Sequence, residues 1–248
     1  MEADPFRVFL EMQLRLSRNA PGSDAMTRAM FEGVDGLPLE PEMLFMGCGQ
    51  GNEVTELLRC SNGRATSVDM LKPFLAKLEA KAEDAGISGE RLRTVCSDFE
   101  ALDLPEGIFD LLWSEGAIYT LGFEEGLKDW ANYLKPGGLA VVSEATWLTD
   151  TPNAEAKLFW EKAYPIMGTL GENVGRAKRA GFELLQTQVL PEEDWWTDYY
   201  QPLIAEARET YGGDPGVQAM LDEEETEIRL YERHAADYGY VFYVLKRT

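Results

Sequence analysis

The chain has 248 residues, 45% of them hydrophobic, which is enough to bury a substantial core. Its 44 Asp and Glu residues outnumber 23 Lys and Arg residues, so the formal net charge is −21. This sign opposes nucleic acid and anionic lipid as partners, because phosphate binding relies on basic side chains. The excess of acidic residues has two interpretations: it keeps the protein soluble, or it attracts a cationic substrate.

Cysteine and histidine are too sparse to suggest a metal centre. Cys48, Cys60 and Cys96 form no CxxC pair, and His234 has no cysteine near it in the sequence. We therefore expect no zinc site and no other bound metal. Few, unpaired thiols are typical of a reducing compartment, and neither a secretory signal nor a membrane-spanning apolar run is recognisable. We expect a cytoplasmic protein with no membrane partner.

The first 40 residues predict a helical segment. Residues 6–17 place apolar side chains at near-helical spacing, and the Pro21-Gly22 pair then predicts a loop. Ser23 is expected to cap a second helix that runs to about Phe31, because its hydroxyl can accept a hydrogen bond from the first turn.

From Met43 onward, predicted strands alternate with helices. In chain order we expect strand 43–46, helix 53–59, strand 64–69, helix 71–85, strands 92–96 and 109–114, helix 124–134 and strand 139–143. The alternation then loosens into a loop with a helix over 150–170, helix 172–180, strand 182–190, a mostly helical insertion over 191–237 and strand 240–245. This order favours a parallel sheet with helices on both faces. With no internal repeat or linker, residues 1–248 are expected to form one domain: a helical segment 1–40, a core 41–148, and the remaining strands over 149–248 with the helical cap 191–237.

Three glycines, Gly47, Gly49 and Gly51, follow the first strand and open a helix. Glycine suits a backbone that approaches a ligand closely, and the helix N-terminus offers free N–H groups. A purely structural turn explains the same triplet. A dinucleotide fingerprint needs glycine at position 52, where Asn52 stands, so the spacing disfavours a nicotinamide cofactor.

Acidic residues follow the next two strands. Asp69 lies 18 residues after Gly51, where a carboxylate can accept hydrogen bonds from ribose hydroxyls, although a helix cap is the alternative role. Asp98 and Phe99 follow the third strand. Because the carboxyl ends of parallel strands share one edge of the sheet, these residues predict a ligand site there.

From about residue 40 to 146 the chain resembles the class I S-adenosylmethionine-dependent methyltransferases. The segments that carry this resemblance are 47–51, Asp69, 97–100 and 134–138. Segments 113–119, 143–147 and 239–243, together with Pro21-Gly22-Ser23, resemble more narrowly a bacterial subgroup of unassigned small-molecule substrate. The resemblance implies an α/β fold: a Rossmann-like seven-stranded, mostly parallel sheet with helices on both faces, N-terminal helices and a helical insertion before the last strand.

The resemblance also implies that the chain binds S-adenosylmethionine. Asp69 would hold the ribose, Asp98 the exocyclic amine of adenine, and Phe99 would pack on the adenine ring or offer its N–H. The loop at 21–23 would lie near the methionine end. The residues expected to contact the cofactor are Gly22, Ser23, Gly47, Cys48, Gly49, Gly51, Asp69, Met70, Asp98, Phe99 and Ser114.

One position departs from the family pattern. An acidic residue normally stands two positions before the first glycine of the motif, and Phe45 stands there instead. Either other polar groups hold the cofactor, or the fold has lost catalysis and kept a binding role. Transfer of a methyl group needs little more than proximity when the acceptor is already nucleophilic.

Glu115 follows the fourth strand and is a candidate catalytic base or a holder of a cationic acceptor; a helix cap or a buried ion pair is the alternative. Tyr119 is a candidate donor to the acceptor, with core packing as its alternative. Trp147, Trp196, Tyr199 and Tyr200 are expected to wall an acceptor pocket beneath the 191–237 insertion, unless they are simply core of the cap. The sequence thus predicts methylation of a small molecule, while the acidity and the cap disfavour a protein or nucleic-acid substrate; the oligomeric state stays open.

Overall fold

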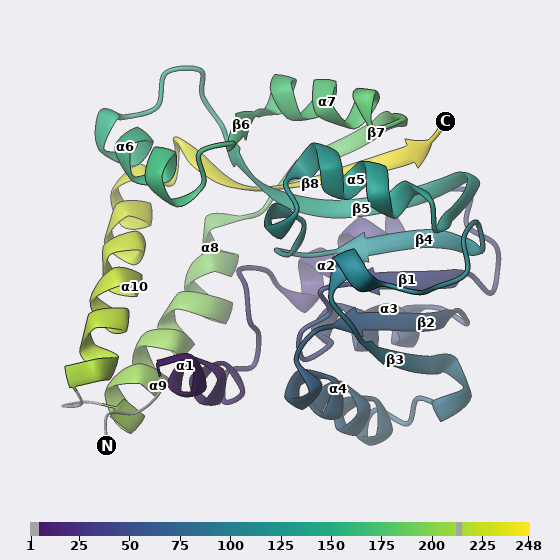
Figure 1. Cartoon of the computed structure of the whole chain (residues 1–248), viewed down its shortest axis with the longest axis horizontal. Coiled ribbons are helices and arrows are strands. Elements are labelled where there is room, and N and C mark those ends of the chain that lie inside the picture. The colour runs from purple at the N-terminus through teal and green to yellow at the C-terminus, as the bar shows by residue number, and fades with distance from the viewer. Residues whose placement is uncertain (1–4, 212–214) are drawn as a thin grey trace.

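The fold is described from a computed structural model that covers residues 5–211 and 215–248 (Figure 1). In these ranges one sheet has the strand order β3-β2-β1-β4-β5-β8-β7, and a short β6 pairs with β5 beside this path. The strands are β1 (Glu42–Met46), β2 (Arg64–Asp69), β3 (Leu92–Cys96), β4 (Phe109–Ser114), β5 (Leu134–Trp147), β6 (Gly168–Thr169), β7 (Phe182–Val189) and β8 (Tyr238–Arg247).

The sheet is mostly parallel. β3, β2, β1, β4 and β5 pair in parallel, whereas β8 runs antiparallel to both β5 and β7. The predicted Rossmann-like α/β fold with seven main strands is therefore confirmed, and the two-residue β6 is an addition that the sequence did not predict.

Helices cover both faces of the sheet. The helices are α1 (Pro5–Gln13), α2 (Asp24–Glu32), α3 (Asn52–Cys60), α4 (Lys72–Asp84), α5 (Phe123–Ala131), α6 (Ala154–Ala163), α7 (Leu170–Arg179), α8 (Glu192–Trp195), α9 (Gln201–Tyr211) and α10 (Pro215–His234), with a π-helical turn at Trp196–Tyr200. Along β1, Met43 and Phe45 point into a core shared with α2 and α3, while Leu44 and Met46 point into a core shared with α5 and α7.

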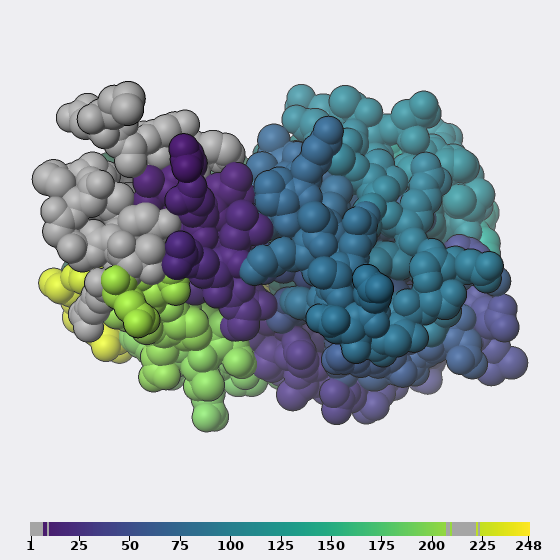
Figure 2. All heavy atoms as spheres, turned by 90° about the horizontal axis from the view of Figure 1, so that it is seen from below, coloured from purple at the N-terminus to yellow at the C-terminus, as the bar shows by residue number. Residues whose placement is uncertain are grey.

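The predicted helical insertion forms a cap. α8, α9 and α10 lie beyond the carboxyl ends of the parallel strands, with α1 and α6 beside them (Figure 1). Seen from below, the N-terminal segment (purple) lies between the cap (green) and the sheet with its helices (blue) (Figure 2). Residues 212–214 of the predicted insertion lie outside the described ranges. None of the helices in the described ranges is long and apolar enough to cross a membrane.

Several predicted boundaries differ from the structure, among them the end of the helix predicted at 124–134, the start of the fifth strand and the end of the first helix. The fifth strand was expected at 139–143, yet β5 begins at Leu134, because Leu134 already pairs with Phe109 and the register then jumps to Leu139 opposite Leu111. The strand continues to Trp147 because β8 pairs with it along its whole second half. The first helix ends at Gln13 rather than near residue 17, and the chain that follows passes over the glycine turn.

Candidate functional site

A cavity of about 460 Å³ opens at the carboxyl ends of β1 to β4, and we refer to it as the edge cavity. It is lined by Asn19, Ala20, Gly47, Gly49, Asp69, Met70, Leu71, Phe74, Ser97, Asp98, Phe99, Glu100, Glu115, Gly116, Ala117, Tyr119, Thr120 and Leu121. Residues after each of these four strands thus meet at one edge of the sheet, as the order of the parallel strands requires.

The glycine turn forms one wall of this cavity. Gly47 and Gly51 have φ values of +71° and +75°, and a side chain at either position would collide with Ala117 or Leu78. The N–H of Gly47 donates to the carbonyl of Val68 at 2.9 Å, so the turn is fastened to β2. Glycine is therefore needed here for the backbone path itself, in addition to any ligand.

Asp69 joins this turn to the start of α4. Its Oδ2 accepts a hydrogen bond from the Gly49 N–H and its Oδ1 accepts one from the Leu71 N–H, both at 2.9 Å. Burial raises the pKa of Asp69, and these backbone donors offset part of the rise. Asp69 therefore lies in the cavity wall where a ribose ligand is expected, and it holds the residue before α4 without acting as the helix cap that was its alternative role.

Asp98 and Phe99 also line the edge cavity, and the Phe99 ring lies beside Gly47. The Asp98 Oδ1 accepts from the Glu100 N–H at 3.0 Å and so caps a short 3-10 turn. The Phe99 ring packs edge-on against Trp130, with 5.4 Å between ring centroids. Met70 is 64% exposed at the mouth of the cavity.

Glu115 is buried in a hydrogen-bonded ion pair. Its Oε2 accepts from Arg18 at 3.2 Å, and its Oε1 accepts from Thr27 at 2.7 Å and from the Trp113 indole at 2.8 Å. Arg18 also donates to Asp24 at 2.8 Å. Three donors already bind this carboxylate, so the geometry matches the buried ion pair named as its alternative better than a free catalytic base.

A recess of about 40 Å³ lies behind the glycine turn. It is lined by Arg18, Asn19, Ala20, Gly47, Cys48, Gly49, Gln50, Gly51, Asn52, Glu53 and Glu115. Burial raises the pKa of Glu53 to about 8, with a further contribution from the charge of Glu115, while Arg18 lowers it. The recess therefore contains two acidic side chains that share one arginine.

The N-terminal segment is tied to the same place. The Gln50 side-chain amide donates to the carbonyls of Gln13 and Leu16 and to Asn19 Oδ1, at 2.7, 3.2 and 3.1 Å. Gly22 lies against the Arg18–Glu115 pair. Ser23 caps α2 as expected, accepting from Met26 N–H at 3.1 Å, and its hydroxyl also donates to Asp194 of α8 at 2.8 Å.

A second cavity of about 350 Å³, the cap cavity, lies between the sheet edge and the cap. It is lined by Gln13, Asn19, Ala20, Pro21, Gly116, Tyr119, Ala145, Trp160, Ala163, Tyr164, Trp195, Tyr199, Glu224, Glu227 and Tyr240. Asn19, Ala20, Gly116 and Tyr119 line both cavities, so the two meet there. Tyr119 is half exposed and packs edge-on against Tyr164 with 6.1 Å between centroids.

The four aromatic residues predicted to wall an acceptor pocket lie in different places. Tyr199 lines the cap cavity, but Tyr200 is fully buried behind it and donates to Glu227 at 2.8 Å. Trp147 packs against Tyr238, and Trp196 packs against Tyr200. Neither tryptophan is part of the described lining of the cap cavity.

The predicted cofactor set also divides by position. Gly47, Gly49, Asp69, Met70, Asp98 and Phe99 line the edge cavity, and Cys48 and Gly51 line the recess. Gly22, Ser23 and Ser114 line neither, and the buried Ser114 hydroxyl has no hydrogen-bond partner in the described part of the chain.

The sequence prediction missed several residues of these sites. They are Arg18, Asn19, Glu53, Trp160, Tyr164, Trp195, Glu224, Glu227 and Tyr240. Among these residues, Tyr240 alone lies in a segment that carried the family resemblance, which is a reason to consider it for the site. Within 5–211 and 215–248, no group of three or more His, Cys, Asp or Glu side chains is placed to hold a metal ion.

Comparison with known proteins identifies relatives of this fold. Residues 43–138 match the family model described as a methyltransferase domain. A sterol 24-C-methyltransferase of Gibberella zeae is 27% identical over 178 residues, which are 67% of this chain and 46% of that protein. The chain thus spans about half the length of the first curated relatives it matches.

Solved structures agree over the whole chain. YjhP of Escherichia coli superposes with a TM-score of 0.82 at 21% identity and covers 98% of this chain and 100% of its own. A methyltransferase of Geobacter sulfurreducens, solved in complex with S-adenosylhomocysteine, has a TM-score of 0.82 at 17% identity and covers 100% and 99%. Residues 43–138 thus match the methyltransferase-domain family, and the whole chain shares the fold of a solved S-adenosylmethionine-dependent methyltransferase.

Proposed function

We propose that this protein transfers the methyl group of S-adenosylmethionine to a small molecule held in the cap cavity. The observation that carries the proposal is the junction of the two cavities at Asn19, Ala20, Gly116 and Tyr119. A cofactor in the edge cavity can present its methyl group at this junction to an acceptor on the other side. A cap over the acceptor supports a small substrate, since a polymer would need an open groove.

In the proposed cofactor pose, Asp69 and Met70 flank the ribose, and Asp98 and Phe99 hold the adenine. The methionine end reaches the glycine turn and the recess at Cys48 and Gly51. The Asp69 carboxylate keeps lone pairs beyond its two backbone donors, because each carboxylate oxygen can accept about two hydrogen bonds.

The recess supplies an answer to the missing acidic residue at Phe45. Phe45 is fully buried in the core, whereas Arg18, Glu53 and Glu115 surround the recess beside the glycine turn. We infer that Arg18 attracts the cofactor's carboxylate and that Glu53 and Glu115 attract its ammonium group. This is the first of the two explanations that the sequence left open, in which other polar groups replace the carboxylate.

The proposed reaction is a direct displacement. A lone pair of the acceptor forms the new bond to the methyl carbon, and the electron pair of the carbon–sulfur bond leaves with sulfur, which becomes the neutral thioether. Positioning supplies most of the acceleration in such a reaction. Tyr119 lines both cavities and is the side chain best placed to orient the acceptor. Glu115 is assigned to the cofactor's methionine end, where it also holds Arg18, and not to the acceptor as a base.

The relatives support a small acceptor without naming it. The sterol 24-C-methyltransferases act on sterols, and another relative, from Synechocystis, is a 2-methyl-6-phytyl-1,4-hydroquinone methyltransferase. A binding module without catalysis is the second candidate, motivated by Phe45 alone.

Two measurements test the proposal in order. Calorimetry on the full chain should detect binding of S-adenosylhomocysteine and no binding of NAD. Incubation of the protein with S-adenosylmethionine and a panel of small acceptors should then release S-adenosylhomocysteine. Cofactor binding with no release for any acceptor class would favour the binding module, and absence of cofactor binding would refute both candidates.

A further inference from the structure

The cap cavity has the size of a site for a compact ligand. Its volume of about 350 Å³ lies at the lower end of the roughly 300–1,000 Å³ that is usual for ligand pockets. Its walls come from α1, the 19–21 loop, the segment after β4, β5, α6, α8, the π-helical turn, α10 and β8, so a ligand would contact both the sheet edge and the cap.

Aromatic rings form much of its wall. Trp160, Trp195, Tyr199 and Tyr240 all line the cavity, and Trp195 and Tyr240 pack together with 5.0 Å between ring centroids. The faces of such rings carry negative electrostatic potential, so several rings around one space favour a cation within it. Aromatic walls alone would serve a flat neutral ligand equally well.

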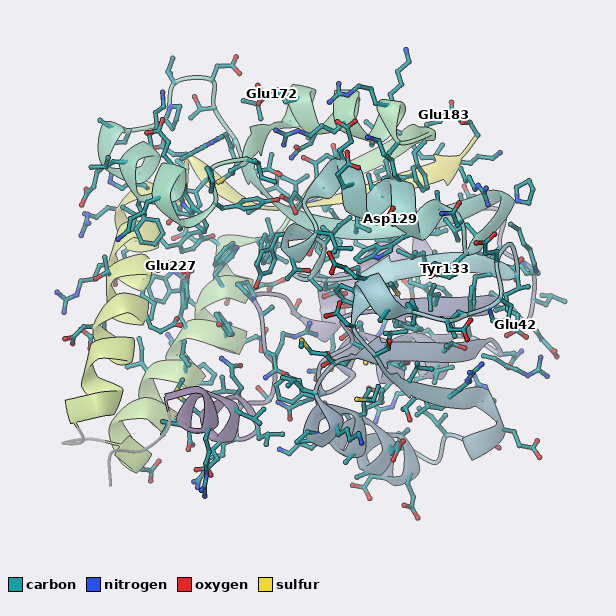
Figure 3. The ribbon with its side chains drawn as sticks, viewed as in Figure 1. Glu42, Asp129, Tyr133, Glu172, Glu183 and Glu227 are labelled. Atoms are coloured by element: carbon teal, nitrogen blue, oxygen red, sulfur yellow. The ribbon has the colours of Figure 1, made fainter. Side chains whose placement is uncertain are left out.

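The charge of the wall distinguishes these two ligands. Glu227, on the side of α10 that faces α8, lines the cavity and is partly buried (Figure 3). The Tyr200 hydroxyl donates to it at 2.8 Å, which fixes the direction of the carboxylate. Burial raises the pKa of Glu227, which indicates that its ionised form is poorly solvated there. Glu224 is a second acidic side chain in the same wall.

Among the described lining residues of the cap cavity none is Lys, Arg or His. A buried carboxylate is costly unless a positive charge and hydrogen bonds compensate it. A ligand that brings a positive charge into the cavity would supply this compensation, and the surrounding rings would stabilise the same charge.

We propose that the methyl acceptor is a compact molecule bearing an ammonium group, which the cap cavity binds between its aromatic wall and Glu227. This inference rests on the proposed function, because it takes the cap cavity as the acceptor site. The inference requires an ammonium group on the acceptor. It does not depend on which acceptor atom receives the methyl group.

The test compares two probes that differ in charge alone. Choline carries a quaternary ammonium group, and 3,3-dimethylbutan-1-ol is its uncharged carbon isostere. Calorimetric titration of each into the full chain saturated with S-adenosylhomocysteine should show choline binding at least about tenfold more tightly, which is the size of a desolvated cation–π and ion-pair contribution.

Variants locate the binding. Glu227→Gln should weaken choline binding about tenfold and leave the isostere unchanged, because it keeps the shape and removes the charge. Glu232→Gln, on the exposed side of the same helix, is the matched control and should change neither affinity. Tyr199→Leu should also weaken choline more than the isostere. Retained binding of S-adenosylhomocysteine shows that each variant is folded.

The outcomes separate the two proposals. Equal affinity for both probes, tighter binding of the isostere, or no choline binding by the S-adenosylhomocysteine complex would overturn the ammonium acceptor and leave the proposed methyltransferase function standing. Failure of the unmodified protein to bind S-adenosylhomocysteine would instead refute the proposed function, and this inference with it.

Discussion

Glu144, on β5, is a buried carboxyl group whose ionisation should destabilise the folded state. It is 1% exposed, and neither of its oxygens makes a hydrogen bond within the described part of the chain. Burial raises its pKa from 4.5 to about 7, although the nearby Tyr164 hydroxyl and the charge of Arg176 lower it somewhat. Tyr164 lines the cap cavity, so this carboxyl group stands directly behind the proposed acceptor site.

The magnitude follows from that rise in pKa. The pKa of Glu144 rises from 4.5 to about 7, and each pKa unit corresponds to about 1.36 kcal/mol. Ionisation of Glu144 in the folded state therefore lowers the free energy of unfolding by about 3 kcal/mol. The folded state holds this proton more tightly than the unfolded state does, so the folded state binds more protons between pH 4.5 and 7. The stability that Glu144 contributes in its neutral form is therefore complete below about pH 4.5 and is lost as the pH rises through 7.

Replacement of Glu144 by Gln removes the ionisation and keeps the shape. We expect Glu144→Gln to match the unmodified protein near pH 4.5 and to be about 3 kcal/mol more stable at pH 8, measured by urea unfolding at a series of pH values. Glu183→Gln on β7 replaces an exposed carboxylate (Figure 3) and should give no pH-dependent difference. A stability difference between Glu144→Gln and the unmodified protein that stays constant from pH 4.5 to 8 would refute the reasoning.

Three further predictions concern the proposed site. Asp69→Ala should weaken S-adenosylhomocysteine binding by about 1–3 kcal/mol in calorimetry, because it removes the charged acceptor and releases the Gly49 N–H; unchanged affinity would remove Asp69 from the ribose site. Phe45→Asp should lower the unfolding temperature with no gain in cofactor affinity, because it buries a carboxylate in the core; tighter binding would indicate a decayed cofactor site instead. The amides of α8 and the π-helical turn should exchange with solvent more slowly once S-adenosylhomocysteine and an acceptor are bound, as a lid requires, and equal exchange rates in both states would make this segment a fixed part of the fold.

The order of elements was predictable because local patterns determine it. The glycine turn, the apolar runs at 43–46 and 109–114, and the Lys-Pro-Gly-Gly motif within 134–138 each mark an element within a few residues. Parallel order then places Asp69 and Asp98 at one edge, so the edge cavity follows from the sequence. The start of β5 did not follow, because the pairing of Leu134 with Phe109 depends on a register shift between two strands.

The cap cavity was not predictable in the same way. Trp160 and Tyr240 are 80 residues apart in the sequence and meet only when α6 and β8 pack together with the cap. Within the insertion, neighbouring aromatics divide between roles: Trp195 and Tyr199 line the cavity, whereas Tyr200 fills the core behind them. Helical spacing shows that such residues are buried, but the packing of the helices decides which of them reach a cavity.

The Phe45 position shows why a departure from a family pattern needs the structure to interpret it. Phe45 pairs in register with Trp113, and both are fully buried in the same core. The Trp113 indole donates to Glu115, which in turn holds Arg18. A carboxylate at position 45 would therefore enter the apolar layer that supports this ion pair.

It would also add another acidic group to a region where Glu53, Glu115 and Asp24 already share Arg18. Like charges in a poorly solvated site raise one another's pKa and lower stability. In this chain the acidic groups proposed for the methionine end are Glu53 of α3 and Glu115 after β4, and their countercharge is Arg18 of the N-terminal segment. A phenylalanine at position 45 is consistent with that arrangement. On this argument the substitution marks a rearranged cofactor site, and the loss of catalysis does not follow from it.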